Sequence, residues 1–262
     1  MISVVSLRLL LLFFLPSIIS TPVKRWSNEH AQCRFSPTFT QENVLSDPDS
    51  YAWEMMYWEG QFHTNDIGYN TENGMTYDGT LIDPVTGQNN VSEKHVFSAA
   101  SKEAIQIMIY AKALAGDEYA GRFVSPTDHY QGAEKAASIM RTKLATYQRF
   151  NATFPGYGGL LPWFYSNETN IRPSADWVNR IPALDNGELL WSVYAAVSAM
   201  EDSKNSHWDD LIAGWNDWLD YTKSTVKEVS YKGSSPLIET AVLPWQRQRL
   251  RSFLSQSNSI SL

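Results

Sequence analysis

Two carboxylates, Asp185 and Glu188, stand three residues apart where a loop rich in glycine and aromatic residues enters an apolar segment. On the first turn of a helix, side chains at this spacing lean toward one face, and the helix dipole favours negative charge there. Two carboxyl groups flanking a scissile bond are also what glycoside hydrolysis needs. In the alternative, structural interpretation, Asp185 caps the helix and Glu188 completes a capping box. Spacing alone leaves both open.

Aromatic and amide side chains flank this acidic pair. Trp163 and Tyr165 precede it, Asn186 lies within it and Trp191 follows it. Indole and phenol rings can form the apolar walls of a sugar-binding cleft, where a few polar groups fix the orientation of the ligand. These residues are therefore candidate substrate contacts. Their alternative role is to enlarge a hydrophobic core.

A second candidate pair, Trp58 and Glu59, closes an earlier helical segment. Glu59 is a candidate cleft acid together with Glu54, and the alternative is that both are acids on a helix surface. The consecutive aspartates Asp209 and Asp210 are similar to those of helical-toroid mannanases, although the acidic first turn of an ordinary amphipathic helix is the favoured explanation. The histidines show no metal-ligand spacing, and no phosphate-binding or dinucleotide motif is present. We therefore expect neither a metal nor another cofactor.

The elements that must position these residues are predicted to be helices. Apolar periodicity predicts helices over 49–62, 98–115, 131–150, 189–200 and about 207–229. The apolar faces are predicted to hold Ile105, Ile109 and Ala113 beside Met108 in the second, Ala136, Ile139, Met140 and Leu144 in the third, and Leu211, Trp215, Trp218, Leu219 and Thr222 in the last. Segment 189–200 is apolar nearly all round, which predicts burial on every side. Segments 63–94 and 151–186 are expected to be long loops. No sustained strand alternation is present, so we expect an all-α fold of toroid type, in which buried inner helices alternate with half-exposed outer ones.

Three segments carry a resemblance to a known family. The segments LDNGELLW, PGYGGLLPWFY and SAASKEAIQIMIYAKALAGD resemble those of the glycoamylase-like α/α-toroid proteins, and more narrowly the eukaryotic endo-β-1,2-glucanases. The resemblance covers about residues 51–229. It implies an (α/α)6 toroid and an inverting glycoside hydrolase of linear β-1,2-glucan. It also implies Asp185 and Glu188 as acids lining the cleft, with further carboxylates in the second half of the ring.

The number of expected helices matches only about half of such a ring, so the chain is predicted to be truncated and its own activity is in question. Two other functions stay open beside the glucanase. One is a carbohydrate-binding glycoprotein without catalysis, and the other is another helical-toroid glycanase such as an endo-mannanase. An interaction protein whose tryptophans all lie in the core is a further alternative. The expected domain spans 49–232, after a polar arm at 21–48 and before an irregular tail at 233–262.

The N-terminus predicts export. Arg8 is followed by the apolar run 9–15, then Pro16 and the small residue Ser20, the layout of a signal peptide over 1–20. This run is too short to span a bilayer. Lys24 and Arg25 form a candidate dibasic processing site. We therefore expect a secreted, extracellular protein with no membrane anchor after cleavage.

Composition agrees with this address. Three glycosylation sequons begin at Asn90, Asn151 and Asn167, each in a stretch expected to be a surface loop. Cys33 is the single cysteine, so no intrachain disulfide can form. The net charge of −7 argues against nucleic acid as a partner. The expected partner is a polysaccharide or oligosaccharide substrate, bound by a monomer.

Overall fold

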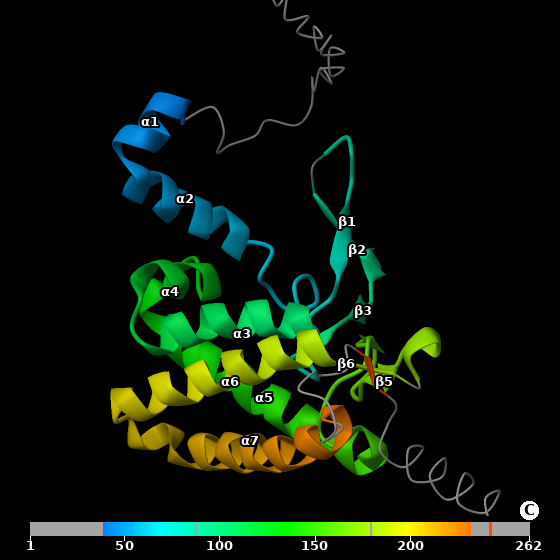
Figure 1. Ribbon diagram of the computed structural model, residues 1–262. Helices are drawn as coiled ribbons and strands as arrows, with labels where there is room; N and C mark the ends of the chain where they lie inside the picture. Colours follow the sequence, from blue (N-terminus) through cyan, green and yellow to red (C-terminus); the bar gives the residue numbers. More distant parts are fainter. Residues whose placement is uncertain (1–38, 87, 179, 232–240, 243–262) are drawn as a thin grey trace, which may run out of the picture.

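The computed structural model describes residues 39–86, 88–178, 180–231 and 241–242 (Figure 1). The predicted signal peptide, Lys24, Arg25 and Cys33 lie outside these ranges, as do most of the predicted arm and nearly all of the predicted tail. The described part is mostly helical. Its α-helices are α1 (Gln41–Ser46), α2 (Pro48–Gly60), α3 (Ala100–Leu114), α4 (Glu118–Val124), α5 (Gly132–Thr153), α6 (Ala183–Ser203) and α7 (Asp209–Ser230).

Short strands accompany the helices, so the expectation of an all-α fold is corrected to a mostly helical one. They are β1 (Gly79–Ile82), β2 (Asn89–His95), β3 (Phe97–Ser98), β4 (Phe164–Tyr165), β5 (Arg172–Pro173), β6 (Ile181–Pro182) and β7 (Ala241–Val242). They form an antiparallel hairpin, β1–β2, a sheet in the order β3–β4–β5 and a pair, β6–β7. Most are too short for side-chain alternation to show in the sequence.

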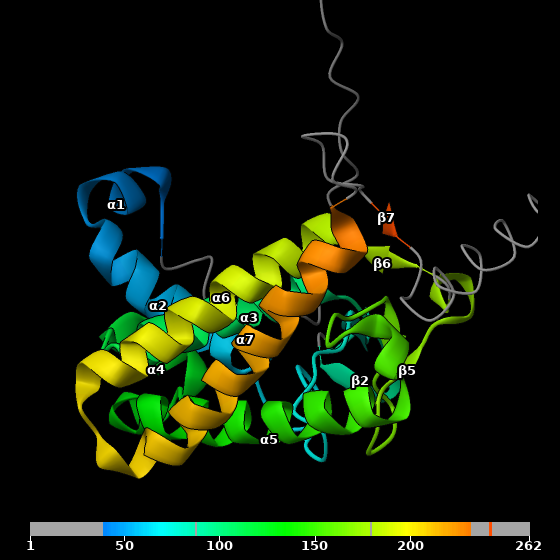
Figure 2. The ribbon, with the colours of Figure 1, turned by 60° about the horizontal axis from the view of Figure 1, so that its bottom comes forward.

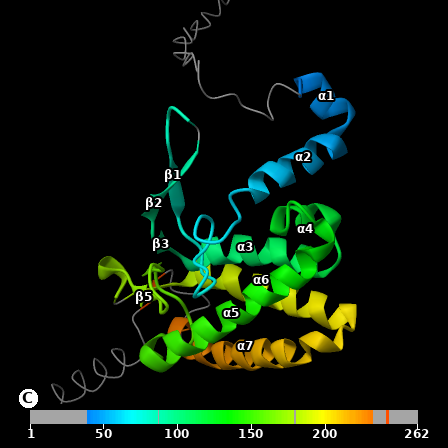
Figure 3. The ribbon, with the colours of Figure 1, turned by 180° about the vertical axis from the view of Figure 1, so that it is seen from behind.

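Helices α3 and α6 form the centre of the fold. They lie side by side, and in Figures 1 and 3 both begin at the end where the short strands gather. β3 leads into α3 and β6 leads into α6, so the two helices run in the same direction. Their buried residues include small and aliphatic ones, Ala104, Ile107 and Ala111 on α3 and Val193 and Ala196 on α6, which allow close packing.

Helices α5 and α7 pack outside this pair, as Figure 2 shows. On α5 the predicted apolar stripe of Ala136, Ile139, Met140 and Leu144 is buried. On α7 the predicted face is confirmed, because Leu211, Trp215, Trp218 and Thr222 are buried and Leu219 packs partly buried against the core. Both helices alternate a buried face with an exposed one, which is why their 3.6-residue period was readable from the sequence.

The faces of α3 and α6 differ from the predicted ones. Of the predicted stripe of Ile105, Ile109 and Ala113, Ala113 is buried and Ile109 packs partly buried against the core, but Ile105 is 67% exposed and the neighbouring Met108 is exposed too. The core face of α3 is centred on Ile107, Tyr110 and Leu114. Segment 189–200 is not buried on every side either, because Trp191 is 71% exposed. An apolar residue type does not say which face of a central helix has a neighbour.

A buried ion pair ties α3 to α5 and to the loop before β1. Lys143 Nζ lies 2.5 Å from Glu103 Oε2, and both side chains are fully buried. The second carboxylate oxygen of Glu103 accepts hydrogen bonds from the N–H and the hydroxyl of Thr76. A buried charge is tolerated when it is paired and fully hydrogen-bonded. Glu103 thereby fixes the loop whose next residues are Tyr77 and Asp78.

Two segments predicted as irregular contain helix or strand. α1 and the start of α2 fall within the predicted arm, and the β1–β2 hairpin falls within the predicted loop 63–94. α4 was not predicted. No helix among the described residues combines the length and the apolar character that a membrane crossing needs.

Candidate functional site

The predicted site residues around the acidic pair gather at the N-terminal ends of α3 and α6. Trp163 directly precedes β4, which pairs with β3 immediately before α3. Asp185 lies in the first turn of α6. The short sheet therefore brings the loop after α5 to the beginning of both central helices. Free backbone N–H groups and the helix dipoles favour anionic groups at this end.

Trp163 holds Asp185 directly. Its indole Nε1 donates a hydrogen bond to Asp185 Oδ2 at 3.1 Å. The Trp163 ring is itself fixed, since it stacks on Trp177 with centroids 4.4 Å apart and meets the edge of Phe97 at 5.3 Å. No hydrogen bond to the other carboxylate oxygen of Asp185 is formed within the described residues. The arrangement presents a half-buried, oriented carboxylate beside an aromatic surface.

The capping interpretation of the acidic pair is wrong. α6 begins at Ala183, and its N-cap is Pro182, with no side-chain cap. Proline has no backbone N–H, so Asp185 cannot complete a capping box with it. Glu188 lies nearly two turns into α6 and is exposed. It shares the exposed side of the helix with Trp191 at the i+3 position.

Asn186 has a different surrounding from the acids on either side of it. It is 1% exposed, and its Oδ1 accepts the N–H of Leu161 at 2.8 Å. Its Nδ2 donates to the carbonyl oxygens of Leu161 and Pro182. The structure thus shows Asn186 as a clamp between α6 and the loop that carries Trp163. As a substrate contact, it stays a prediction from the sequence.

The remaining aromatic candidates lie near this end of the fold. Tyr165 is half-buried in β4, and the guanidinium of Arg172 covers its ring at 4.8 Å from the centroid. Trp191 lines a groove of about 530 Å³ between α6 and α7 together with Tyr194, Leu219 and Lys223. Both residues stay predicted substrate contacts.

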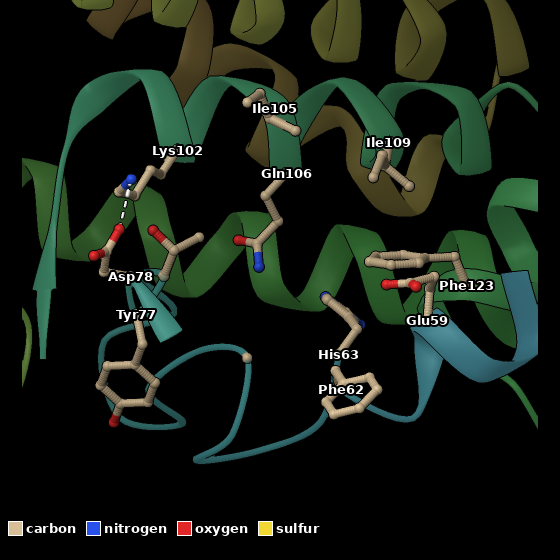
Figure 4. Close-up of a pocket in the computed structure, with 12 residues that line it drawn as sticks. Glu59, Phe62, His63, Tyr77, Asp78, Lys102, Ile105, Gln106, Ile109 and Phe123 are labelled. Atoms are coloured by element: carbon tan, nitrogen blue, oxygen red, sulfur yellow. Dashed lines mark ion pairs between the residues drawn. The ribbon is translucent and has the colours of Figure 1, made fainter. Parts of the chain in front are cut away.

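Trp58 and Glu59 are separate from the acidic pair. They end α2, where Trp58 meets the edge of Tyr57 at 5.2 Å. Glu59 lines a cavity of about 350 Å³ against α3, shown in Figure 4. Glu54, the other acid considered there, lies 3.4 Å from Arg122 of α4. The structure therefore divides the predicted contacts between two places.

The cavity beside Glu59 contains residues that sequence reasoning missed. At its other end Asp78 lies 2.6 Å from Lys102 Nζ and 2.7 Å from His95 Nδ1. Partial burial raises the pKa of Asp78, but the hydrogen bonds from Lys102 and His95 outweigh it and hold that pKa below its usual value. Gln106 and His63 lie between the two ends (Figure 4). These residues come from separate segments, so no local spacing signal could have grouped them.

The other sequence candidates lie away from both places. Asp209 and Asp210 are in the first turn of α7, and Asp210 is paired with Arg141 of α5. Asn167 is exposed in the loop after β4, as predicted. Asn90 and Asn151 were predicted in loops, but Asn90 belongs to β2 and Asn151 to the last turn of α5. Asn151 Oδ1 accepts the N–H of Gly159.

Comparison with known proteins identifies the family. Residues 75–253 match the sequence profile of the endo-beta-1,2-glucanase SGL family. The chain is similar to the endo-beta-1,2-glucanase of Talaromyces funiculosus in complex with sophorose, with 48% identity and a TM-score of 0.77 over 82% of this chain and 44% of that one. A glutamate-to-glutamine mutant of that enzyme with beta-1,2-glucan gives 49% identity, the same TM-score and the same coverage. No curated protein matched the chain.

The chain spans less than half the length of these solved relatives. The profile match covers more than half of the chain, and the identity to the relatives is far above the level at which only a fold is shared. The resemblance first inferred from three sequence segments is therefore confirmed. The chain belongs to the endo-beta-1,2-glucanase SGL family of glycoside hydrolases.

Proposed function

We propose that this chain forms the part of a toroidal hydrolase that binds linear β-1,2-glucan across the N-terminal ends of α3 and α6. Three observations support the proposal: family membership, the parallel pair of central helices, and the oriented Asp185–Trp163 pair where both helices begin. The last of these carries it. A carboxylate fixed beside a stacked indole offers a hydrogen-bond acceptor for sugar hydroxyls next to an apolar surface for a sugar ring.

Glu188 is assigned the proton transfer in this proposal. It lies one helical turn from Asp185 on the side of α6 that also bears Trp191. In the inverting reaction, a carboxylic acid protonates the glycosidic oxygen as the C1–O bond breaks, and a second carboxylate takes the proton of the water that attacks the opposite face. Asp185 lies on the same helix face as Glu188, so it is assigned to sugar hydroxyls and to orienting the ring. Tyr165 and Trp191 extend the aromatic surface.

Export is part of the same proposal. A polymer such as β-1,2-glucan is met outside the cell, and the predicted signal peptide at 1–20 with sequons at Asn90, Asn151 and Asn167 is consistent with that location.

Glucan binding tests the proposal. We expect the full chain to be retarded in affinity electrophoresis through linear β-1,2-glucan, and Trp163→Ala to reduce the retardation by at least tenfold in apparent affinity. This substitution removes both the aromatic surface and the group that orients Asp185. Glu188→Gln keeps the size of the side chain but cannot transfer a proton, so it should keep binding and the melting temperature while abolishing any release of oligosaccharides.

The control is Glu228→Gln, the same change at an exposed position near the end of α7. It should match the wild type in binding, melting and oligosaccharide release. Binding that is unchanged by Trp163→Ala, or oligosaccharide release that survives Glu188→Gln, would overturn the assignment of the site.

A further inference from the structure

The cavity between α2, α3 and the loop before β1 contains a buried polar group that the fold does not use. Gln106 of α3 is 8% exposed, and within the described part of the chain its Oε1 has no hydrogen-bond partner. Figure 4 shows its amide directed away from α3, between Asp78 and His63. Native proteins leave few buried polar groups unpaired, because each one has lost its water without gaining a partner. Gln106 is therefore positioned to form a hydrogen bond with a ligand in the cavity.

The charges around the cavity favour a neutral occupant. Glu59 lies at one end, and at the other Asp78 neutralises Lys102 at 2.6 Å. The described residues that line the cavity therefore offer no unpaired cation to a phosphate or a carboxylate. The His63 ring adds none either, because burial and the nearby Lys135 and Lys143 lower the pKa of His63 to about 3. Among the described residues, no group of three or more His, Cys, Asp or Glu side chains is arranged to hold a metal ion.

The sides of the cavity are apolar, whereas its two ends are polar. Ile105 and Ile109 of α3 line one side of the cavity, Phe62 lines the opposite side, and Phe123 lies near Glu59 (Figure 4). The cavity volume of about 350 Å³ is within the range of small-molecule sites, roughly 300–1,000 Å³. Apolar walls with an amide in the middle and carboxylates at the ends suit a ring that has C–H faces and hydroxyl edges.

We propose that this cavity is a second carbohydrate site, which takes one neutral, hydroxyl-rich ring of the kind a glucose residue presents. Gln106 is its central hydrogen-bonding group, and Glu59 and Asp78 accept hydroxyls at its two ends. The choice of a glucose-type ligand rests on the function proposed above. The place, the size and the neutrality of the site rest on the cavity itself.

Side-chain NMR of the ¹⁵N-labelled full chain, titrated with sophorose, tests this site separately from the one at Trp163. The Gln106 amide signals are assigned by their loss in Gln106→Met, and the Trp163 indole signal by its loss in Trp163→Ala. We expect sophorose to shift the Gln106 amide signals in a saturable way. The Gln106→Met variant should bind sophorose at least tenfold more weakly, as measured from the NMR signals of the other side chains that line the cavity.

The melting temperature separates a ligand contact from a structural role. Gln106→Met replaces an unpaired amide with an apolar chain of similar size, so we expect the melting temperature to be unchanged or higher. A lowered melting temperature with unchanged sophorose binding would make Gln106 a structural residue and overturn the proposal. The matched control, Gln148→Met at an exposed position of α5, should change neither property.

The two proposals fail separately in this experiment. A shift of the Trp163 indole signal without any change at Gln106 would overturn the second site and leave the proposed function intact. A shift at Gln106 alone would support the cavity and overturn the site at Trp163. No shift at either position would overturn both.

Discussion

Asp185 and Asn186 are neighbours in the sequence, yet their side chains have opposite surroundings. Asp185 is half-buried and oriented by Trp163, whereas Asn186 is enclosed and hydrogen-bonded to the backbone at Leu161 and Pro182. Because successive residues of a helix point about 100° apart, one can face the site and the next the interior. Replacing either residue would therefore test a different property, substrate binding for Asp185 and folding for Asn186.

His63 gives a pH dependence at the residue scale. It is buried, and its Nε2 is hydrogen-bonded to the Tyr110 hydroxyl at 2.7 Å. Burial lowers its pKa to about 3, while in the unfolded chain the ring titrates near 6.5. Below about pH 6.5 the unfolded state therefore binds a proton that the folded state does not bind. The stability that depends on the neutral His63 ring is fully present above pH 6.5 and is lost as the pH falls from there toward 3.

We expect urea unfolding between pH 7.5 and 4.5 to show this loss. Below pH 6.5 the wild type should lose up to about 1.4 kcal/mol of unfolding free energy per pH unit more than His63→Gln, which has no titrating ring. His207→Gln, at an exposed position, should keep the slope of the wild type. Parallel pH profiles for wild type and His63→Gln would show that His63 is accessible to protons in the folded state.

At the scale of elements, α4 and α5 are held together by two glycines. A Cβ on Gly132 would lie 2.4 Å from the Cα of Gly121, and a Cβ on Gly121 would lie 2.6 Å from the carbonyl oxygen of His129. The obstructing atoms belong to the backbone, so they cannot rotate aside. This close approach seats α4 against the start of α5 and beneath α2, which in turn carries Glu59 to its cavity.

Alanine at two helical glycines should therefore have opposite effects. Gly132→Ala should destabilise the protein by about 1–3 kcal/mol, because the helices must separate to admit the methyl group. Gly187→Ala should stabilise it by roughly 0.5–1 kcal/mol, because α6 gains a better helix former and no atom of the described residues lies within 4 Å of the new Cβ. Chemical unfolding of both variants measures this. A Gly132→Ala protein as stable as the wild type would contradict the packing described here.

At the scale of the whole molecule, two features concern its surface. Ile105 and Met108 on α3, with Leu184, Trp191 and Tyr194 on α6, expose large apolar side chains on the two central helices. Solved relatives are more than twice as long as the part that matches this chain. If these side chains form one contiguous surface, such a patch is typical of a surface that takes part in binding. The second surface feature is the set of glycosylation sequons that begin at Asn90, Asn151 and Asn167.

Expression in a eukaryotic secretory host tests the proposed export. We expect secreted protein that begins near Thr21, or near Trp26 if Lys24 and Arg25 are cleaved. Treatment with an endoglycosidase should lower its apparent mass.

Simultaneous replacement of Asn90, Asn151 and Asn167 by glutamine should abolish that change in mass. Among the single variants, Asn151→Gln alone should also lower the melting temperature, because Asn151 Oδ1 accepts the N–H of Gly159. Asn167→Gln, at an exposed loop position, should not. Protein that stays in the cytosol and carries no glycans would contradict the proposed secretion.

The sequence by itself determined the family and the helices that have one buried face. α5 and α7 were readable because alternation between core and solvent imposes the 3.6-residue period on the residue types. The segment around Asp185 and Glu188 was one of three that carried the resemblance to the glucanases, and it lies within the range 75–253 that matches the family profile. Such patterns lie within a single segment, so they can be recognised without knowing which segments contact one another in the fold.

Tertiary structure decided what depends on contacts between distant segments. The outward orientation of Ile105 and Trp191 was not predictable, since an apolar side chain looks the same in the sequence whether or not another helix covers it. The short strands exist because their partners lie far away in the chain, as with β3 and β4. The cavity that joins Glu59, Gln106 and Asp78 forms only when α2, α3 and the intervening loop are packed together.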